Sequence, residues 1–290
     1  MLITSPANPR IAKVRDLQTT RGRKKSDLFL IEGLNLFEAM LDAQVYPQEV
    51  YYQPELLQRT ARGNTLLQRL LHTSHLLDSQ RIEVNMRVIE AISDAMTSQG
   101  IVGVVSIDAL FPESTRTRRA TQEQSRPTPV HRPALLVLDD ISDPGNMGTI
   151  LRTALAADVD AVLLTPNCTD PYSPKVLRAA TGTHFFLPIE SDLSWEKIAE
   201  RIHNHSLPDA PNVLLAEAGS TQIYYDVDLT HPFTLIIGNE AHGPSREARA
   251  LATNSVTIPL ANHVESLNAA IATAILLYEA VRQVQRHNNT

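Results

Sequence analysis

The chain of 290 residues contains one cysteine, Cys168, and no unbroken run of eighteen apolar residues. A lone cysteine excludes an internal disulfide framework. The missing apolar run excludes an ordinary transmembrane helix, which needs about 20 such residues. The first ten residues, MLITSPANPR, also lack the charged start and apolar core of a secretory signal. These absences predict a cytoplasmic protein that does not associate with membranes.

Sequence signatures of several common enzyme classes are absent as well. No G-x-G-x-x-G follows the first strand of either half and no G-x-x-x-x-G-K-[ST] occurs, which argues against a dinucleotide-binding domain and a P-loop NTPase. No G-x-S-x-G elbow occurs, so an α/β-hydrolase is not expected.

Residues that bind metal ions are sparse and poorly spaced. His203 and His205 have no Cys or carboxylate partner at ligand spacing, so the sequence predicts no metal site. His242 and His263 are typical of exposed loop histidines, although either could touch a ligand. Cys168 has no flanking base and fits an ordinary thiol.

The formal net charge of −6 is unevenly distributed along the chain. Residues 1–133 hold 17 Lys and Arg against 14 Asp and Glu, whereas residues 134–290 hold 9 against 18. Residues 1–25 alone hold 7 basic residues and 1 acidic residue. A basic segment on an acidic body indicates local contact with a polyanion, and the alternative is a solvated, flexible basic arm.

Residues 111–133 are rich in proline and polar residues and almost free of apolar ones, which is typical of a linker. They separate an N-terminal module, residues 1–110, from a C-terminal module, residues 134–290. Hydrophobic residues make up 43% of the chain, enough for a core in each module.

Both modules alternate apolar β-like runs with stretches of helical spacing, which predicts an α/β fold throughout. In the N-terminal module the expected strands are residues 28–33, 49–53, 81–85 and 100–107, and the expected helices are residues 34–44 and 86–96. In the C-terminal module the expected strands are residues 134–140, 161–165, 213–218, 233–238 and 255–260. The expected helices there are residues 148–157, 174–181, 195–204, 245–252 and 266–283.

The C-terminal strands are short, apolar and β-branched, which indicates a parallel sheet covered by helices on both faces. The last helix carries an apolar stripe at spacings of three and four, which suits a core or an interface. Its members are Leu267, Ala270, Ile271, Ala274, Leu277, Tyr278 and Val281.

Polar loops follow three of the C-terminal strands, in contrast to the apolar strands themselves. Their sequences are ISDPGNMGTILR, NEAHGPS and ANHVESLN. Because open parallel sheets bind ligands beyond the carboxyl ends of their strands, these loops are candidates for one shared site.

Together the three loops resemble, in order, the three motifs of the SpoU (TrmH) branch of the SPOUT RNA methyltransferases. The motif segments here are NMGTILR, IIGNEAHG and IPLANHVESLNAAIATAILLYE, and DPYSPKVLRAATGTHFFLPI between the first two is also similar to that family. The resemblance covers residues 134–282. The start of the chain, through FLIEGLNLFEAM, resembles the substrate-binding domain that many members carry, which is similar to ribosomal proteins of the kink-turn type.

The resemblance implies transfer of a methyl group from S-adenosylmethionine to a ribose 2′-hydroxyl of RNA, and a deep trefoil knot in the C-terminal module. The implied cofactor-binding residues are Ala218, Gly238, Ile258, Leu260 and Leu267, which offer an apolar slot for adenine and close backbone approach at the glycine. The implied catalytic residues are Arg152, Asn146, Glu240, Ser266 and Asn268.

Arg152 is the residue expected to activate the hydroxyl, either as a phosphate-assisted base or purely electrostatically. It follows Asn146 by less than two helical turns, and Leu151 and Leu155 flank it. Asn146 is expected to position the RNA, to support the catalytic loop or to cap a helix, and Glu240 to orient a loop or the neighbouring subunit's arginine. Ser266 and Asn268 are expected to hydrogen-bond near the methyl donor or the substrate, and Ser266 also to cap the last helix. Asn262 and His263 stand where many relatives have small residues.

The implied partners are RNA and a second copy of the chain, joined through the catalytic module. Basic residues near the start are expected to grip phosphates without reading sequence. They are Arg10, Lys13, Arg15, Arg23, Lys24 and Lys25. Large-subunit ribosomal RNA is the favoured substrate. The alternatives are a tRNA methyltransferase, an antibiotic-resistance rRNA methyltransferase, and an RNA-binding assembly factor without turnover.

Overall fold

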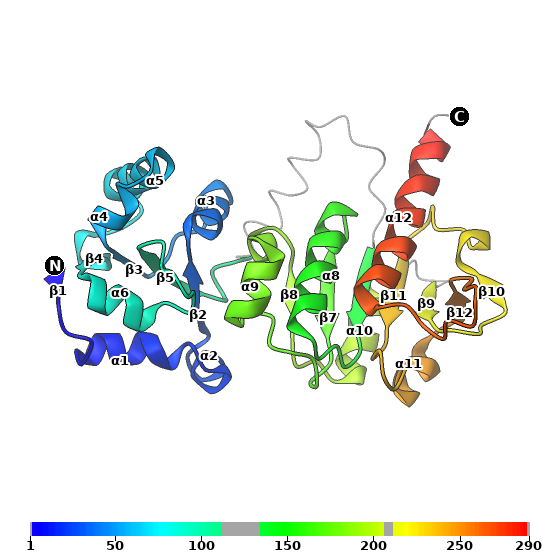
Figure 1. Ribbon diagram of the computed structural model, residues 1–290. Helices are drawn as coiled ribbons and strands as arrows, with labels where there is room; N and C mark the ends of the chain where they lie inside the picture. Colours follow the sequence, from blue (N-terminus) through cyan, green and yellow to red (C-terminus); the bar gives the residue numbers. More distant parts are fainter. Residues whose placement is uncertain (1, 112–133, 206–210, 289–290) are drawn as a thin grey trace. The chain divides into compact units, whose positions relative to one another are not determined.

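A computed structural model describes residues 2–111, 134–205 and 211–288 of the chain (Figure 1). These residues form two compact units. The first contains residues 2–111 together with Tyr172–Phe185, and the second contains the remaining described residues. Apart from Phe111, the predicted linker 111–133 lies outside the described residues.

The segment Tyr172–Phe185 belongs by sequence to the predicted C-terminal module but packs with the first unit. Its Tyr172, Leu177 and Phe185 are buried in that unit's apolar core. Packing units and domains of the chain need not coincide, so the boundaries 1–110 and 134–290 stay a prediction.

The first unit is built on a five-stranded sheet with the strand order β1-β4-β3-β5-β2. β1 and β3 run parallel to β4, whereas β5 is antiparallel to β3 and to β2. Its strands are β1 (Leu2–Ile3), β2 (Leu28–Glu32), β3 (Glu49–Tyr52), β4 (Arg81–Val84) and β5 (Ile101–Ser106). Its helices are α1 (Pro9–Asp16), α2 (Thr20–Ser26), α3 (Leu34–Asp42), α4 (Pro54–Leu57), α5 (Ala61–His72), α6 (Met86–Ile92) and α9 (Pro174–Ala180).

Successive apolar side chains along the strands point to opposite faces of this sheet, so each face carries an apolar core. On β2, Phe29 and Ile31 belong to one buried cluster, and Leu30 between them belongs to the other. The first cluster contains Phe37 of α3, and the second contains Ile11 of α1. The predicted α/β fold is therefore confirmed for this unit.

The basic start of the chain is folded, so the alternative of a flexible basic arm is wrong. The side chain of Asn8 caps α1 by accepting a hydrogen bond from the Arg10 N–H, and Thr19 caps α2 by accepting one from the Gly22 N–H. Ile11 of α1 is fully buried. The caps stabilise the starts of both helices, and the burial of Ile11 and Val14 among residues of the sheet holds α1 against it.

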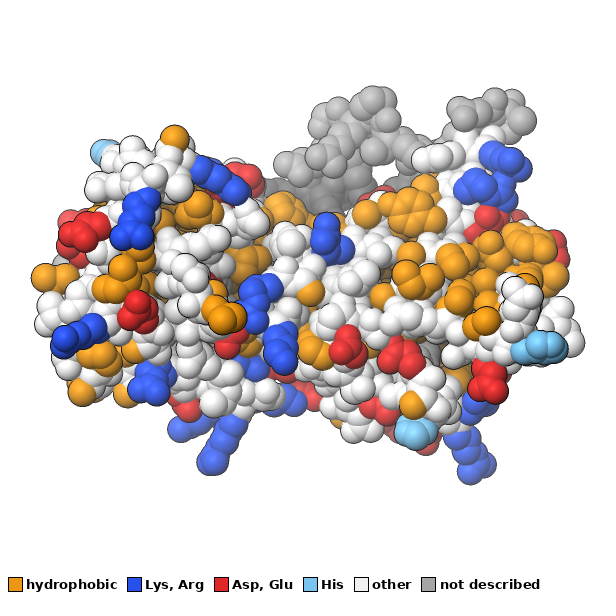
Figure 2. Space-filling model, in the orientation of Figure 1, with side chains coloured by type: hydrophobic (Ala, Val, Ile, Leu, Met, Phe, Trp, Pro, Cys, Tyr) orange, Lys and Arg blue, Asp and Glu red, His pale blue; other side chains and the backbone are white. Residues whose placement is uncertain are grey.

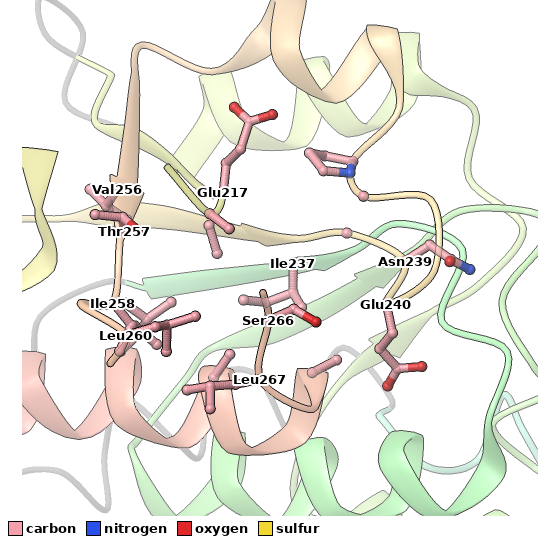
Figure 3. Close-up of a pocket in the computed structure, with 18 of the residues that line it drawn as sticks. Glu217, Ile237, Asn239, Glu240, Val256, Thr257, Ile258, Leu260, Ser266 and Leu267 are labelled. Carbon is pink, nitrogen blue, oxygen red and sulfur yellow. The ribbon is translucent and has the colours of Figure 1, made fainter. Parts of the chain in front are cut away.

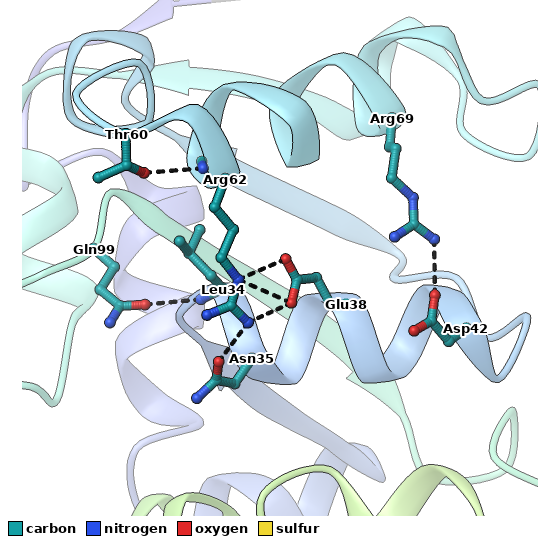
Figure 4. A network of polar contacts seen from close by, with 9 residues as sticks. Leu34, Asn35, Glu38, Asp42, Thr60, Arg62, Arg69 and Gln99 are labelled. Atoms are coloured by element: carbon teal, nitrogen blue, oxygen red, sulfur yellow. Dashed lines mark hydrogen bonds and ion pairs between the residues drawn. The ribbon is translucent and has the colours of Figure 1, made fainter.

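A polar network fixes the helices α3 and α5 to each other (Figure 4). The Arg62 guanidinium pairs with Glu38, donating from Nε to Oε1 at 2.9 Å, and also donates to Asn35 at 2.6 Å. Arg69, about two turns further along α5, pairs with Asp42 at 3.0 Å. The hydrogen bond from Arg62 holds the pKa of the Glu38 carboxyl below its ordinary value.

The second unit is built on a seven-stranded parallel sheet with the order β10-β12-β9-β11-β6-β7-β8. Its strands are β6 (Ala134–Leu138), β7 (Ala161–Leu164), β8 (Ile189–Glu190), β9 (Val213–Ala216), β10 (Gln222–Ile223), β11 (Phe233–Ile237) and β12 (Asn254–Thr257). Its helices are α8 (Pro144–Ala156), α10 (Trp195–His205), α11 (Arg246–Leu251) and α12 (Ala269–Asn288). The predicted parallel sheet is confirmed, and the two-residue edge strands β8 and β10 were too short to give a periodic signal.

Helices cover both faces of this sheet (Figure 1). On one face, Ile198 of α10 and Ala248 of α11 pack on alternate strand residues such as Val137 and Leu215. On the other face, α8 and α12 pack against each other. None of the helices within the described ranges has the length and apolar character needed to cross a bilayer.

The apolar stripe expected on the last helix, for a core or an interface, is buried only in part. Ala270 and Leu277 are buried as expected, but Ile271 is 53% exposed and Tyr278 is 50% exposed. The buried face instead includes Leu276 and Ala280. The spacing of apolar residues shows how wide the apolar face of a helix is. Which side of that face is buried depends on the elements that pack against the helix.

Candidate active site

The loops that leave β9, β11 and β12 enclose a cavity of about 300 Å³ with the start of α12 (Figure 3). All five residues implied to bind the cofactor line this cavity. They are Ala218, Gly238, Ile258, Leu260 and Leu267. Glu240 and Ser266 line it too. Figure 3 draws Ile258 and Leu260 at one end of the cavity and Glu240 toward the other.

Gly238 is required by the fold of its own loop. A Cβ atom at this position would lie 2.5 Å from the Pro244 nitrogen and 2.9 Å from the Gly243 carbonyl carbon. The sequence suggested a close approach of the backbone to a ligand, but the close approach in the structure is between two parts of one turn. This turn forms one wall of the cavity.

Two side chains that the sequence analysis did not single out tie the β11 loop to the end of β6. Asn239 donates from Nδ2 to the Asp140 carbonyl at 2.9 Å and accepts from the Ala241 N–H at 2.8 Å. The buried Asp139 carboxylate accepts a hydrogen bond from the Ser245 N–H at 2.7 Å. Polar residues directly after buried strands were the available signal for both.

A chain of side-chain hydrogen bonds joins three of the implied catalytic residues. Asn146 donates from Nδ2 to Oε1 of Glu240, and its Oδ1 accepts from Nδ2 of Asn268 at 2.9 Å. Each of the three motif loops supplies one of these residues. The amide of Asn146 is therefore held in one orientation at the cavity's edge.

The turn expected before the α8 helix is part of the helix itself. α8 begins at Pro144, and Asp143 caps it by accepting a hydrogen bond from the Asn146 N–H at 2.7 Å, so Asn146 is not the cap. At about 100° per residue, six positions place Asn146 and Arg152 roughly 120° apart around the helix. Only Asn146 joins the hydrogen-bonded chain.

Arg152 is exposed rather than buried, although Leu151 beside it is fully buried. Within the described parts of the chain, its guanidinium makes no hydrogen bond or ion pair. The side chain is thus available to a ligand outside the protein.

The third loop departs from the sequence expectation in its capping residue. α12 begins at Ala269, and the Oδ1 atom of Asn268 accepts from the N–H groups of Ala270 and Ile271, so Ser266 does not cap the helix. Asn262 and His263 both have positive φ, 55° and 61°. Glycine adopts such angles without strain, which explains why small residues suit these positions.

The six basic residues near the start of the chain differ in their availability. Lys13, Arg15, Lys24 and Lys25 are exposed on α1 and α2. Arg10 pairs with Glu49 at 2.7 Å. Arg23 is 3% exposed and donates to the Leu17 carbonyl at 2.8 Å, so its burial removes it from the residues that could grip a phosphate.

Of the two histidines considered as metal ligands, His203 and His205, the second has another partner. His205 pairs with Asp160 at 2.9 Å. Over the described ranges, no group of three or more His, Cys, Asp or Glu side chains could hold a metal ion. Burial raises the pKa of the Cys168 thiol, as expected for an unreactive cysteine.

The profile of the SpoU rRNA Methylase family matches residues 133–278, and that of an MRM3-like substrate binding domain matches residues 8–103. The chain belongs to the SpoU rRNA methylase family. It is therefore an S-adenosylmethionine-dependent RNA methyltransferase, as the resemblance implied.

Individual SpoU relatives match over almost the whole chain. A protein named as an uncharacterized tRNA/rRNA methyltransferase of Synechocystis is 32% identical, covering 97% of this chain and 93% of the relative. The 23S rRNA (guanosine(2553)-2′-O)-methyltransferase RlmP of Bacillus subtilis is 28% identical, covering 95% of this chain and 97% of the relative. The crystal structure of an AdoMet-bound rRNA methyltransferase from Sinorhizobium meliloti is similar at 28% identity and a TM-score of 0.74, with 97% of each chain covered.

Proposed function

We propose that this SpoU protein methylates a ribose 2′-hydroxyl of large-subunit ribosomal RNA, with S-adenosylmethionine as the methyl donor. The observation that carries the proposal is the cavity enclosed by separate strand-end loops, with the Asn146–Glu240–Asn268 chain at its edge. The similarity to RlmP, a 23S rRNA 2′-O-methyltransferase by name, supports this substrate over a tRNA.

The residues that line the cavity fit an adenosyl group. Ile258, Leu260 and Leu267 supply apolar surface from the β12 loop and the segment before α12, and the Gly238 turn contributes its backbone to the lining. Flat apolar slots with a few polar backbone groups are typical of such sites. S-adenosylmethionine supplies an activated methyl group on a sulfonium. We assign to these residues, with Ala218, the binding of its adenosyl part.

Asn146 is proposed to position the ribose beside the donor. Glu240 and Asn268 occupy one donor and one acceptor of its amide, and they leave its second N–H for a ligand. Ser266, exposed at the cavity, is proposed to hydrogen-bond near the methyl donor or the substrate.

Arg152 is proposed to contact the RNA phosphate next to the reacting ribose and to stabilise the negative charge that develops on the 2′-oxygen. A guanidinium keeps its proton in proteins, so an electrostatic role suits it better than that of a base. Its exposure and its lack of a partner among the described residues support this role.

The part of the RNA outside the catalytic site is proposed to bind the exposed basic side chains of α1 and α2. Lys13, Arg15, Lys24 and Lys25 are exposed to solvent, whereas Arg10 would have to leave Glu49 and Arg23 is buried in the fold. Such contacts add affinity without sequence preference. From the similarity to the bacterial RlmP, we propose that the protein acts in the cytoplasm.

A homodimer formed through the catalytic module is also proposed. Hydrophobic side chains gather on the surface over α12 (Figure 2). Ile271 and Tyr278 are half exposed there, and Val264 of the third loop is 52% exposed. Apolar patches of this kind mark interaction sites. A monomeric mass in sedimentation equilibrium at micromolar concentration would count against the dimer.

The assigned reaction is tested by incubating the protein with S-adenosylmethionine labelled in its methyl group and with total RNA from a deletion strain. We expect label in a single 2′-O-methylated nucleoside of large-subunit rRNA. Label in tRNA would overturn the substrate assignment. Tight RNA binding with no label would indicate an assembly factor, and mapping the labelled nucleotide tests the antibiotic-resistance alternative.

A further inference from the structure

Arg249 is the only basic residue among the described residues that line the cavity. It lies on α11, and its Nε and Nη2 atoms each approach Oε1 of Glu217 to 2.9 Å. Its Nη1 atom donates to the Pro244 carbonyl at 2.6 Å. One guanidinium thereby joins three segments: the end of β9, the β11 loop and α11.

The carbonyl that Arg249 holds belongs to the residue on which Gly238 packs. The Gly238 Cα faces the Pro244 backbone so closely that a Cβ atom would not fit between them. Arg249 therefore braces the turn that forms one wall of the cavity, and Glu217 anchors that brace to the neighbouring strand.

The three guanidinium nitrogens of Arg249 are already engaged by Glu217 and the Pro244 carbonyl, and the Glu217 carboxylate is turned away from the apolar lining. In Figure 3 the Glu217 carboxylate points away from Ile258, Leu260 and Leu267. Both side chains are partly exposed, 48% for Arg249 and 31% for Glu217. Exposed ion pairs contribute little to global stability, so the consequence of this pair should be local.

We propose that Glu217 and Arg249 are positioning residues that hold the β9 and β11 loops at the spacing needed to bind the adenosyl group. The inference rests on the proposed cofactor site. Because the pair already orders the two loops, binding of the cofactor does not have to pay the entropy cost of ordering them. The pair therefore increases cofactor affinity. The pair takes no part in methyl transfer, and at saturating cofactor the rate should not depend on it.

Calorimetric titration of S-adenosylhomocysteine, the demethylated product, into the full chain tests the proposal. Arg249→Met should raise the dissociation constant about five- to tenfold, and Glu217→Gln about threefold, because each removes charge-assisted contacts at the wall. The double variant should bind no more weakly than Arg249→Met, since the two residues act through one contact. The turnover rate at saturating S-adenosylmethionine should stay within about twofold of wild type.

Two further variants separate positioning from general damage. Arg246→Met removes the same charge from an exposed position on the same helix and should leave cofactor affinity unchanged. The reversed pair, Glu217→Arg with Arg249→Glu, should regain part of the affinity that either charge reversal alone removes. The thermal unfolding midpoint of each variant shows whether it is folded. If the other variants do not fold, the nearly isosteric Glu217→Gln variant still tests the proposal.

The outcomes distinguish this inference from the proposed function. Wild-type affinity in Arg249→Met, additive effects in the double variant, or a fall in the saturated turnover rate would overturn the positioning role alone. Failure of the unmodified chain to bind S-adenosylhomocysteine would overturn the proposed cofactor site itself.

Discussion

At the scale of single residues, Asn146 shows why this position needs an amide. It donates to the Glu240 carboxylate and accepts from the Asn268 amide, and only a side chain with both a donor and an acceptor does both. An aspartate here would place two carboxylates against each other, and an alanine would leave both partners without their contact. The residue type follows from the two neighbours.

Arg152→Ala is expected to lower the turnover rate at least about 100-fold, because the developing charge on the ribose oxygen loses its stabilising partner. The affinity for S-adenosylmethionine should stay within about twofold, since Arg152 does not line the cavity. Methyl incorporation into rRNA and calorimetric titration of the cofactor measure the two quantities. Arg246→Ala, an exposed arginine outside the cavity lining, is the matched control. A variant with the wild-type rate would refute the assigned role.

At the scale of elements, the site is made by loops whose shapes are set by their own backbone contacts. The β11 turn folds back on itself at Gly238, and the loop after β12 passes through left-handed conformations at Asn262 and His263. α8 begins within the first motif, with Asp143 as its cap. The backbone of each loop is therefore held in one conformation, which fixes the positions of its functional side chains.

Gly238→Ala is expected to destabilise the second unit by about 1–3 kcal/mol, because the new Cβ atom overlaps the Pro244 backbone. The displaced turn should also weaken cofactor binding at least about tenfold, a change of about 1.4 kcal/mol. Chemical denaturation and calorimetric titration check the two effects. Gly219→Ala is the comparison: its φ of 81° is strained but no atom lies within 4 Å of the added Cβ, so the affinity should change less. Equal effects at both glycines would contradict this explanation.

At the scale of the whole molecule, each unit carries a carboxylate stabilised by an arginine on its surface. The hydrogen bond from Arg62 lowers the pKa of Glu38 in the first unit, and the hydrogen bond from Arg282 lowers the pKa of Glu279 in the second, both from 4.5. A carboxyl whose pKa is lower in the folded state stabilises the fold above its unfolded pKa. That stabilisation is lost as the pH falls through the folded value.

The thermal unfolding midpoint is therefore expected to fall as the pH is lowered from about 6 to about 4. Glu279→Gln should reduce this pH dependence for the second unit, since the neutral amide has no proton to gain. Circular dichroism melts at several pH values measure the slope. Glu90→Gln, which alters an exposed carboxylate on α6, is expected to leave the slope unchanged. An unaltered slope in Glu279→Gln would show that this carboxylate is not responsible.

Much of this architecture could be predicted from local patterns. The apolar runs at residues 134–138 and 233–237 became buried parallel strands, and the polar stretches after them became the site loops. The errors lie where tertiary contacts decide. Arg23 was expected to grip a phosphate, but it is buried and donates to the Leu17 carbonyl. Tyr278, for which a core and an interface were both open, lies half exposed. The trefoil knot implied by the resemblance stays a prediction.

The sequence by itself determined the helices and the five longer strands of the C-terminal module, the family, and which loops carry Asn, Glu and Gly, because these depend on side-chain periodicity and on motifs of a few neighbouring residues. The helices α1, α2, α4 and α5 of the first unit were not predicted. Only the tertiary structure decided that Asn146 meets Glu240 across 94 positions and Asn268 across 122, and that Arg249 reaches Glu217. The physical reason is that such contacts arise where parallel strands end at one edge of a sheet. Which ends become neighbours is fixed by the strand order β9-β11-β6, which no local pattern encodes.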